Sequence, residues 1–273
     1  MAQRWSMPHM PSQRSMADMV MVPTTPMVRR IDARDLRDAL AMGWRDFMAS
    51  PTQLLFLGII YPLVGLVAGR VAYGGDMLPL LYPMVAGLAF VGPIAAVGLY
   101  ELSRRREREE PVSWLNTLDV LRSRAIWSIA ALGLLMLTLF LLWLGAAQLV
   151  YDTTLGTLHP ASASEFVRLL FATPEGWQMI VLGNAVGLLF GAVALALSVV
   201  SFPMMLDREV DWVIAMQTSV RAVMANPGTM ALWGMIVVGA LALGCLPAFV
   251  GLAVVMPVLG HATWHLYRMT VRG

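Results

Sequence analysis

Blocks of apolar residues, each about as long as a membrane-crossing helix, fill most of the chain beyond residue 53. A hydrocarbon core of roughly 30 Å requires about 20 apolar residues in a helix, so the blocks predict about six transmembrane helices. Gly244 to Pro247 supplies a turn that divides the final long run in two. The pattern therefore predicts an all-α polytopic membrane protein of three helical hairpins. The predicted spans are residues 54–72, 78–102, 125–150, 179–205, 228–246 and 248–267.

A shorter segment with amphipathic helical spacing precedes each hairpin. In residues 32–50 apolar side chains recur at steps of three and four, with Asp32 as the expected cap and Pro51 as the stop. Similar stretches begin at Ser113 and span residues 211–226. We expect all three on the cytoplasmic membrane surface, where apolar and arginine-bearing faces are both accommodated. The first segment places Ala33, Leu36, Leu40, Trp44, Phe47 and Met48 opposite Arg34, Asp35, Arg37, Asp38, Arg45 and Asp46.

The N-terminal residues have a different character from the rest of the chain. Residues 1–30 are rich in Met, Pro, Ser and Gln, and they contain no apolar run long enough for a signal peptide. We expect a disordered cytoplasmic tail over residues 1–30, followed by one six-span membrane domain over residues 31–273.

Arginine placement predicts the orientation of the chain. Of the 19 arginines, only Arg70 and Arg168 fall on one side of the predicted spans, and the other 17 fall on the opposite side. Basic residues accumulate in cytoplasmic loops. Both termini are therefore expected in the cytoplasm, and the protein in the inner (cytoplasmic) membrane of a bacterium.

Composition narrows the choice of partners and chemistry. Hydrophobic residues make up 58% of the chain, charged residues 13%, and every basic residue is an arginine. Without lysine there is no phosphate-loop lysine and no Schiff base. The net charge is only +2 and the arginines flank apolar blocks, which favours membrane lipids, anionic ones included, over nucleic acid as partners. The single Cys245 forms no internal disulfide.

Two segments match without gaps and indicate an internal repeat. Residues 44–51 (WRDFMASP) align on residues 220–227 (VRAVMANP), and the same register places Gly58 on Gly234. Residues 113–150 resemble a third copy without the proline. The alternative is shared biophysics, because any surface helix that enters a membrane favours arginine, then a small polar residue, then proline.

A stripe of small residues in the fourth predicted span indicates close helix packing. Gly183, Gly187 and Gly191 recur at four-residue spacing around Asn184, a pattern that lets helix backbones approach and hydrogen-bond. Packing within the bundle and the face of a homo-oligomer are both open interpretations.

Candidate chemical residues are few. Arg45 and Arg221 occupy equivalent repeat positions beside predicted spans and are candidate lipid-headgroup ligands, with simple interfacial anchoring as the alternative. His261 and His265 have the i, i+4 spacing of a metal site, but the neighbouring Trp264 and Tyr267 favour an aromatic interfacial belt. We expect no metal and no cofactor. Haem is included in this expectation because His9 and His159, the other two histidines, are remote from that helix.

The residues around the second predicted span resemble those of a known family. Residues 90–105 (FVGPIAAVGLYELSRR) and 43–47 (GWRDF) resemble bacterial integral membrane proteins catalogued as domain of unknown function two-one-eight-nine, over roughly residues 30–270. The resemblance implies a six-helix layout and no established activity. Some members are labelled as similar to cytochrome c oxidase subunit I, whose histidine ligands outnumber the four histidines present here.

No hydrolase, metalloprotease or nucleotide-binding motif occurs in the chain. The sequence therefore favours a non-enzymatic structural, assembly or lipid-interacting factor of the inner membrane. A small-molecule permease and an accessory subunit of a respiratory complex are the alternatives, and a second copy or another membrane protein is an expected partner.

Overall fold

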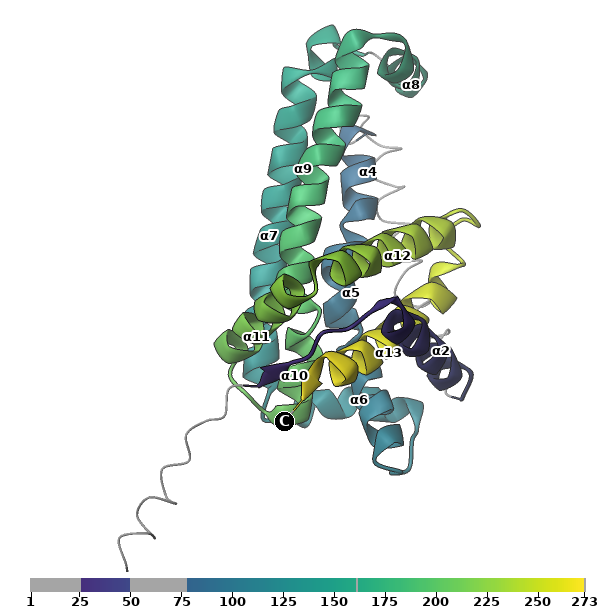
Figure 1. The fold of residues 1–273 in the computed structure, drawn as a ribbon. Helices are drawn as coiled ribbons and strands as arrows, with labels where there is room; N and C mark the ends of the chain where they lie inside the picture. Colours follow the sequence, from purple (N-terminus) through teal and green to yellow (C-terminus); the bar gives the residue numbers. More distant parts are fainter. Residues whose placement is uncertain (1–25, 50–77, 161, 273) are drawn as a thin grey trace, which may run out of the picture.

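The protein is almost entirely helical, as predicted. The computed structural model describes residues 26–49, 78–160 and 162–272 (Figure 1). Within these ranges, three helices are long and apolar enough to cross a membrane. They are α7 (Ile126–Thr153), α9 (Pro174–Ser198) with its continuation α10 (Ser201–Arg208), and α12 (Pro227–Cys245). They correspond to the predicted spans 125–150, 179–205 and 228–246, whereas span 54–72 lies outside the described residues.

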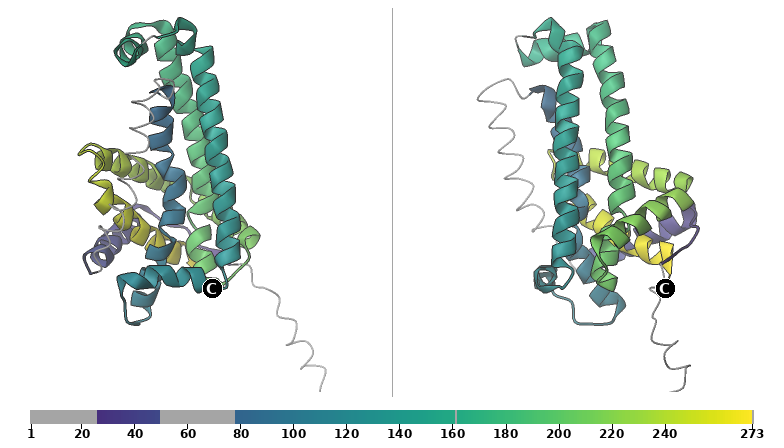
Figure 2. Two further views of the ribbon diagram at one scale, coloured as in Figure 1. Left: turned by 180° about the vertical axis from the view of Figure 1, so that it is seen from behind. Right: turned by 90° about the vertical axis from the view of Figure 1, so that its left-hand side faces the viewer.

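Two long helices form the main body of the molecule. α7 and α9 lie side by side along their lengths, and α4 (Leu78–Ala86) and α5 (Leu88–Ala95) follow the same direction beside them (Figures 1 and 2). Many leucines on α7 and α9 are exposed, among them Leu134 and Leu188. Apolar side chains on an outward face are what a helix surrounded by lipid requires.

The second predicted span is divided into three shorter helices. α4, α5 and α6 (Val97–Glu107) follow one another with breaks at Gly87 and Ala96. Pro83 and Pro93 lie inside α4 and α5, and each proline removes one backbone hydrogen bond from its helix. α6 continues to Glu107, so Arg104, Arg105 and Arg106, which lie beyond the predicted span 78–102, are helical.

The last predicted span, 248–267, corresponds to α13 (Leu252–Thr270), which is enclosed by protein. α13 packs against α2 (Ala33–Ala49), α6 and α12, and twelve of its residues are buried. It is not among the candidate spans of the described residues, because His261, His265 and Arg268 lower its mean hydropathy. The turn before it is tight: a Cβ on Gly251 would lie 2.9 Å from the Gly244 backbone.

Three short helices correspond to the predicted surface segments, and each has a side-chain cap. They are α2, the 3₁₀ helix η1 (Trp114–Arg122) and α11 (Trp212–Ala225), capped by Asp32, Ser113 and Asp211. A capping oxygen accepts a backbone N–H that the first turn leaves free. α2 packs on α13, η1 packs on α6, and α11 packs on α9 and α10. Each thus contacts the end of a different helix.

The remaining elements cover the two ends of the molecule. α8 (Ala163–Ala172) and the short 3₁₀ helix η2 (Leu155–Leu158) connect α7 to α9 at one end (Figure 1). At the other, β1 (Met27–Val28) pairs antiparallel with β2 (Val271–Arg272). Asn226 fixes the segment after β1, since its side chain accepts from the Ile31 N–H at 2.8 Å and donates to the Arg29 carbonyl at 3.1 Å.

Candidate functional site

A cluster of buried polar side chains joins α2, α6 and α13. It contains Asp46, Ser103, His261 and His265, which are 6%, 1%, 0% and 8% exposed, together with Arg106. We call these five residues the Asp46 cluster. Buried polar groups are costly unless they are paired, so the arrangement of these side chains is tightly constrained.

The Asp46 carboxylate is the centre of the cluster. Oδ2 accepts a hydrogen bond from Ser103 Oγ at 2.5 Å and lies 2.9 Å from His265 Nε2. Arg106 Nη1 lies 2.9 Å from Oδ1 and donates to the Asp46 backbone carbonyl at 3.1 Å. One carboxylate on α2 is therefore bound by two residues of α6 and one of α13.

The hydrogen bonds assign the protons on both histidines. Ser103 has one hydroxyl proton and donates it to Asp46, so His261 Nδ1, 2.8 Å from Ser103 Oγ, must be the donor in that contact. His265 Nε2 must likewise carry the proton that it shares with Asp46. His261 Nε2, the other ring nitrogen, has no hydrogen-bond partner among the described residues.

These contacts keep Asp46 ionised. Burial alone would raise the pKa of Asp46, but hydrogen bonds from His265 and Ser103 outweigh it and lower the pKa from 3.8 to about 2. The cluster therefore contains a fixed negative charge that holds the positive Arg106 against the helix ends. Its members are enclosed, and the chemistry open to them is ion pairing and proton sharing.

A close helix crossing brings Asp46 into this position. A Cβ added to Gly43 would lie 2.6–2.8 Å from the backbone and Cβ of Ala262, so α2 and α13 approach more closely than larger residues permit. Asp46 follows three residues later on the same face of α2. The prediction that Asp46 belongs to the polar outer face of this helix is wrong, because the crossing turns its side chain inward.

A second group of charged residues joins the ends of α6, α10 and α13. Glu107 accepts from Trp264 Nε1 and pairs with Arg268 at 2.9 Å. Asp207 accepts from the Tyr267 hydroxyl at 2.8 Å and pairs with Arg268 at 3.0 Å. These contacts fix the three helix ends to one another beside the Asp46 cluster.

Glu101 is also paired rather than simply extended to solvent. It is 2% exposed, and Arg104 and Arg105 lie 2.7 and 2.8 Å from its oxygens. Two arginines on its own helix therefore neutralise the Glu101 carboxylate.

The predicted histidine pair has a different environment from the one expected. His261 and His265 share a face of α13, but that face is buried against α2 and α6 and forms no aromatic interfacial belt. Over the described residues, no group of three or more His, Cys, Asp or Glu side chains is arranged to hold a metal ion. His159 lies in the turn after η2, and His9 is outside the described ranges.

The two predicted headgroup ligands lie on separate surface helices. Arg45 on α2 and Arg221 on α11 are both exposed, and their printed contacts are to the Ala41 carbonyl and the Thr218 hydroxyl. Neither has a carboxylate partner among the residues that the structure describes. Both are accessible to an external anion.

The small-residue stripe on α9 has mixed surroundings. Gly187 faces the Trp143 ring of α7, 3.1 Å from an added Cβ, whereas Gly183 and Gly191 have no described atom within 4 Å of one. Asn184 Oδ1 accepts a hydrogen bond from the Tyr82 hydroxyl of α4 at 3.0 Å. The stripe thus contacts α7 and α4 at two points and leaves two glycines uncovered by described residues.

Sequence reasoning missed Asp46, Ser103 and Arg106 as parts of one site. Their order along the chain contains no motif, since Asp46 and His265 are separated by 219 residues. The usable signals were Gly43, a small residue three positions before a carboxylate, and the two histidines on one face of α13.

A comparison with protein families identifies the central part of the chain. Residues 81–207, from α4 to α10, match the family model described as predicted integral membrane protein (DUF2189). The match includes residues 90–105 but not residues 43–47, and it is shorter than the predicted 30–270. Searches of curated proteins and of solved structures gave no match. Over residues 81–207 the chain is thus similar to the DUF2189 family of predicted integral membrane proteins.

Proposed function

We propose that this integral membrane protein is a non-catalytic structural factor of the bacterial inner membrane that binds anionic lipid headgroups at its cytoplasmic face. The observation that carries the proposal is the exposure of Arg45 and Arg221 without carboxylate partners among the described residues. Arg105, Arg106 and Arg268, by contrast, are ion-paired.

The neighbours of both arginines suit a membrane surface. Trp44 and Met48 are exposed beside Arg45, and Met224 is exposed one turn after Arg221. A cation next to exposed apolar side chains fits the boundary between headgroups and acyl chains. Each arginine near an anionic bilayer contributes about 1 kcal/mol.

The enclosure of the Asp46 cluster supports a structural role. Serine, histidine and aspartate are the residue types of many hydrolytic sites, but Ser103, His261, His265 and Asp46 are not arranged as such a site requires. Ser103 donates to the carboxylate instead of to a histidine, and its side chain is almost inaccessible. The cluster serves to lock α2, α6 and α13 together.

We also infer that the chain contains three copies of one unit, each a surface helix followed by a membrane hairpin. Residues 93–104 align without gaps on residues 257–268, and the final Leu-x-Arg recurs at residues 206–208. Gly98 and Ala262 are equivalent in this alignment. Each contacts a surface helix, Gly98 with Thr117 of η1 and Ala262 with Gly43 of α2.

The packing of the surface helices supports the same inference. α11 packs on the end of the second hairpin, η1 on the end of the first, and α2 on the end of the third. Each surface helix therefore contacts the hairpin of the preceding copy, and the first copy closes on the last. Such a cyclic order is what three equivalent units around one axis would give.

Lipid retention tests the proposed function. The double variant Arg45→Gln, Arg221→Gln, purified from native membrane, should retain at least two-fold less phosphatidylglycerol and cardiolipin by mass spectrometry than the parent protein. Arg168→Gln is the matched control, because Arg168 lies on α8 at the opposite end and pairs with Glu165. If the double variant retains the same amount of anionic lipid as the parent protein, the two arginines anchor their helices at the interface without binding specific headgroups.

A further inference from the structure

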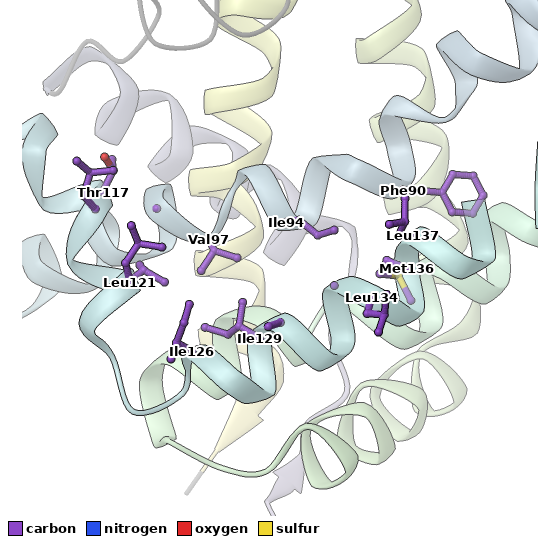
Figure 3. Close-up of a pocket in the computed structure, with 15 residues that line it drawn as sticks. Phe90, Ile94, Val97, Thr117, Leu121, Ile126, Ile129, Leu134, Met136 and Leu137 are labelled. Carbon is purple, nitrogen blue, oxygen red and sulfur yellow. The ribbon is translucent and has the colours of Figure 1, made fainter. Parts of the chain in front are cut away.

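An apolar groove lies between α5 and α6 on one side and η1 and α7 on the other. In Figure 3, Ile94 and Val97 face Ile126 and Ile129 across it. The groove has a volume of about 640 Å³, within the range of roughly 300–1,000 Å³ typical of small-molecule sites. Its lining is apolar apart from Thr117, whose hydroxyl already donates to the Trp114 carbonyl at 2.8 Å. Water would find no free polar partner on these side chains.

The groove exists partly because α7 has a glycine at its floor. An added Cβ at Gly133 would meet only the Ile94 side chain, at 3.7 Å. Glycine within a helix costs about 1 kcal/mol relative to alanine, so a larger residue here would favour the helix and fill the space. A side chain at this position would therefore extend towards Ile94 and occupy part of the groove.

The groove opens on the same side as the exposed apolar side chains of α7 and η1. Leu134 and Leu137 of α7 line it and are exposed, as are Leu118 and Leu121 of η1, the last 67% exposed. A molecule that enters the groove from this side moves from the hydrocarbon interior of the bilayer into an apolar lining. A long apolar molecule suits both environments. A lipid acyl chain has this character.

A cationic residue directly follows the part of η1 that lines the groove. Arg122 ends η1, directly after Leu121 of the lining, and is exposed with no carboxylate partner among the described residues. Arg124, two residues on, reaches Glu209 only at 4.0 Å. Positive charge adjacent to a lining residue of an apolar groove complements an anionic phospholipid.

We propose that this groove binds one acyl chain of an anionic phospholipid, with Arg122 at its headgroup. The inference rests on the proposed lipid-binding function but concerns a different site from Arg45 and Arg221. It gives the protein a lipid held within its fold, next to α6, the helix that carries Ser103 and Arg106.

Photolabelling in lipid nanodiscs tests the groove. The probe is phosphatidylglycerol with a diazirine in one acyl chain, and labelled residues are located by mass spectrometry. Labels should concentrate on residues 94–98 and 129–137, and Gly133→Leu should lower them at least five-fold. Gly145→Leu is the matched control, since Gly145 lies on the same helix with no described atom within 4 Å of an added Cβ. Gly133→Met, with a more flexible side chain, replaces Gly133→Leu if the latter fails to fold.

The outcomes separate the groove from the headgroup sites. Arg122→Gln should lower labelling by phosphatidylglycerol and leave labelling by a phosphatidylcholine probe unchanged. The Arg45, Arg221 double variant should retain full labelling in the groove even where it loses bound lipid. Labels spread evenly along α7, or insensitive to Gly133→Leu, would overturn the acyl-chain site. Equal labelling by the two probes would overturn the anionic headgroup.

Discussion

Asp46 connects three helices through a single carboxylate. Its partners lie on α6 and α13, and apart from Arg106 they are nearly inaccessible. Removing one member of a buried charged pair is costly because the remaining charge is left uncompensated, typically by about 3–5 kcal/mol. The stability of the α2, α6 and α13 junction therefore depends on whether Asp46 is ionised.

Acid should weaken this junction in a defined pH window. The folded-state pKa of Asp46, about 2, lies below its ordinary 3.8, so its contribution is present above pH 4 and is lost as the pH falls towards 2. The pKa difference corresponds to roughly 2–3 kcal/mol. In detergent, the free energy of unfolding of the parent protein should fall by roughly 2–3 kcal/mol between pH 4 and pH 2. The Asp46→Asn variant has no carboxylate to protonate at this position, so this decrease should be absent from its titration.

An exposed carboxylate on the same helix provides the control. Asp38 also lies on α2 but faces outward, so Asp38→Asn should keep the pH dependence of the parent. Identical acid titrations for the parent and Asp46→Asn would show that Asp46 does not stabilise the fold through its charge.

At the scale of helices, the sequence predicts elements well where the determining pattern is local. Length and unbroken apolarity located α7, α9 and α12, and the predicted cap Asp32 located the start of α2. The division of residues 78–107 depends on Pro83 and Pro93, whose effect in a membrane helix ranges from a slight bend to a break. The burial of α13 and of Asp46 was not predictable, because it depends on which helix covers them.

The helix crossing at Gly43 should be intolerant of any side chain. Gly43→Ala places a methyl group within 2.6–2.8 Å of Ala262, and two backbones must separate to accept it. Overpacking of this kind costs about 1–3 kcal/mol, so the thermal unfolding midpoint should fall. Gly239→Ala on α12, with no described atom near its added Cβ, should leave the midpoint unchanged or raise it. Equal midpoints for Gly43→Ala and the parent would show that this crossing is loose.

At the scale of the molecule, the two ends of the described chain lie together. Residues 27–28 pair with residues 271–272, so both sides of the pairing must occupy the same side of the membrane. The arginine distribution predicts that this side is cytoplasmic. The same end of the molecule contains the Asp46 cluster, the paired charges of α6, α10 and α13, and η1 with its last residue Arg122.

Reporter fusions test this orientation, including the predicted span 54–72, which lies outside the described residues. Fusions after residues 75, 160 and 246 should report the periplasm, and fusions after residues 110, 210 and 273 the cytoplasm, because an even number of crossings separates the latter three. Measured alkaline phosphatase and fluorescent-protein activities give the two readouts. A periplasmic signal from the fusion after residue 273 would contradict the six-span arrangement.

The contact between Asp46 and His265 also sets an order of events during synthesis. The two residues are 219 positions apart, and at about 5–20 residues per second the ribosome needs roughly ten to forty seconds to make the chain between them. Throughout that interval α2 has no α13 to cover its carboxylate. A nascent chain that stops before His265 can pair Asp46 only with Ser103 and Arg106 of α6, so the three-helix junction is completed after the rest of the fold has been synthesised.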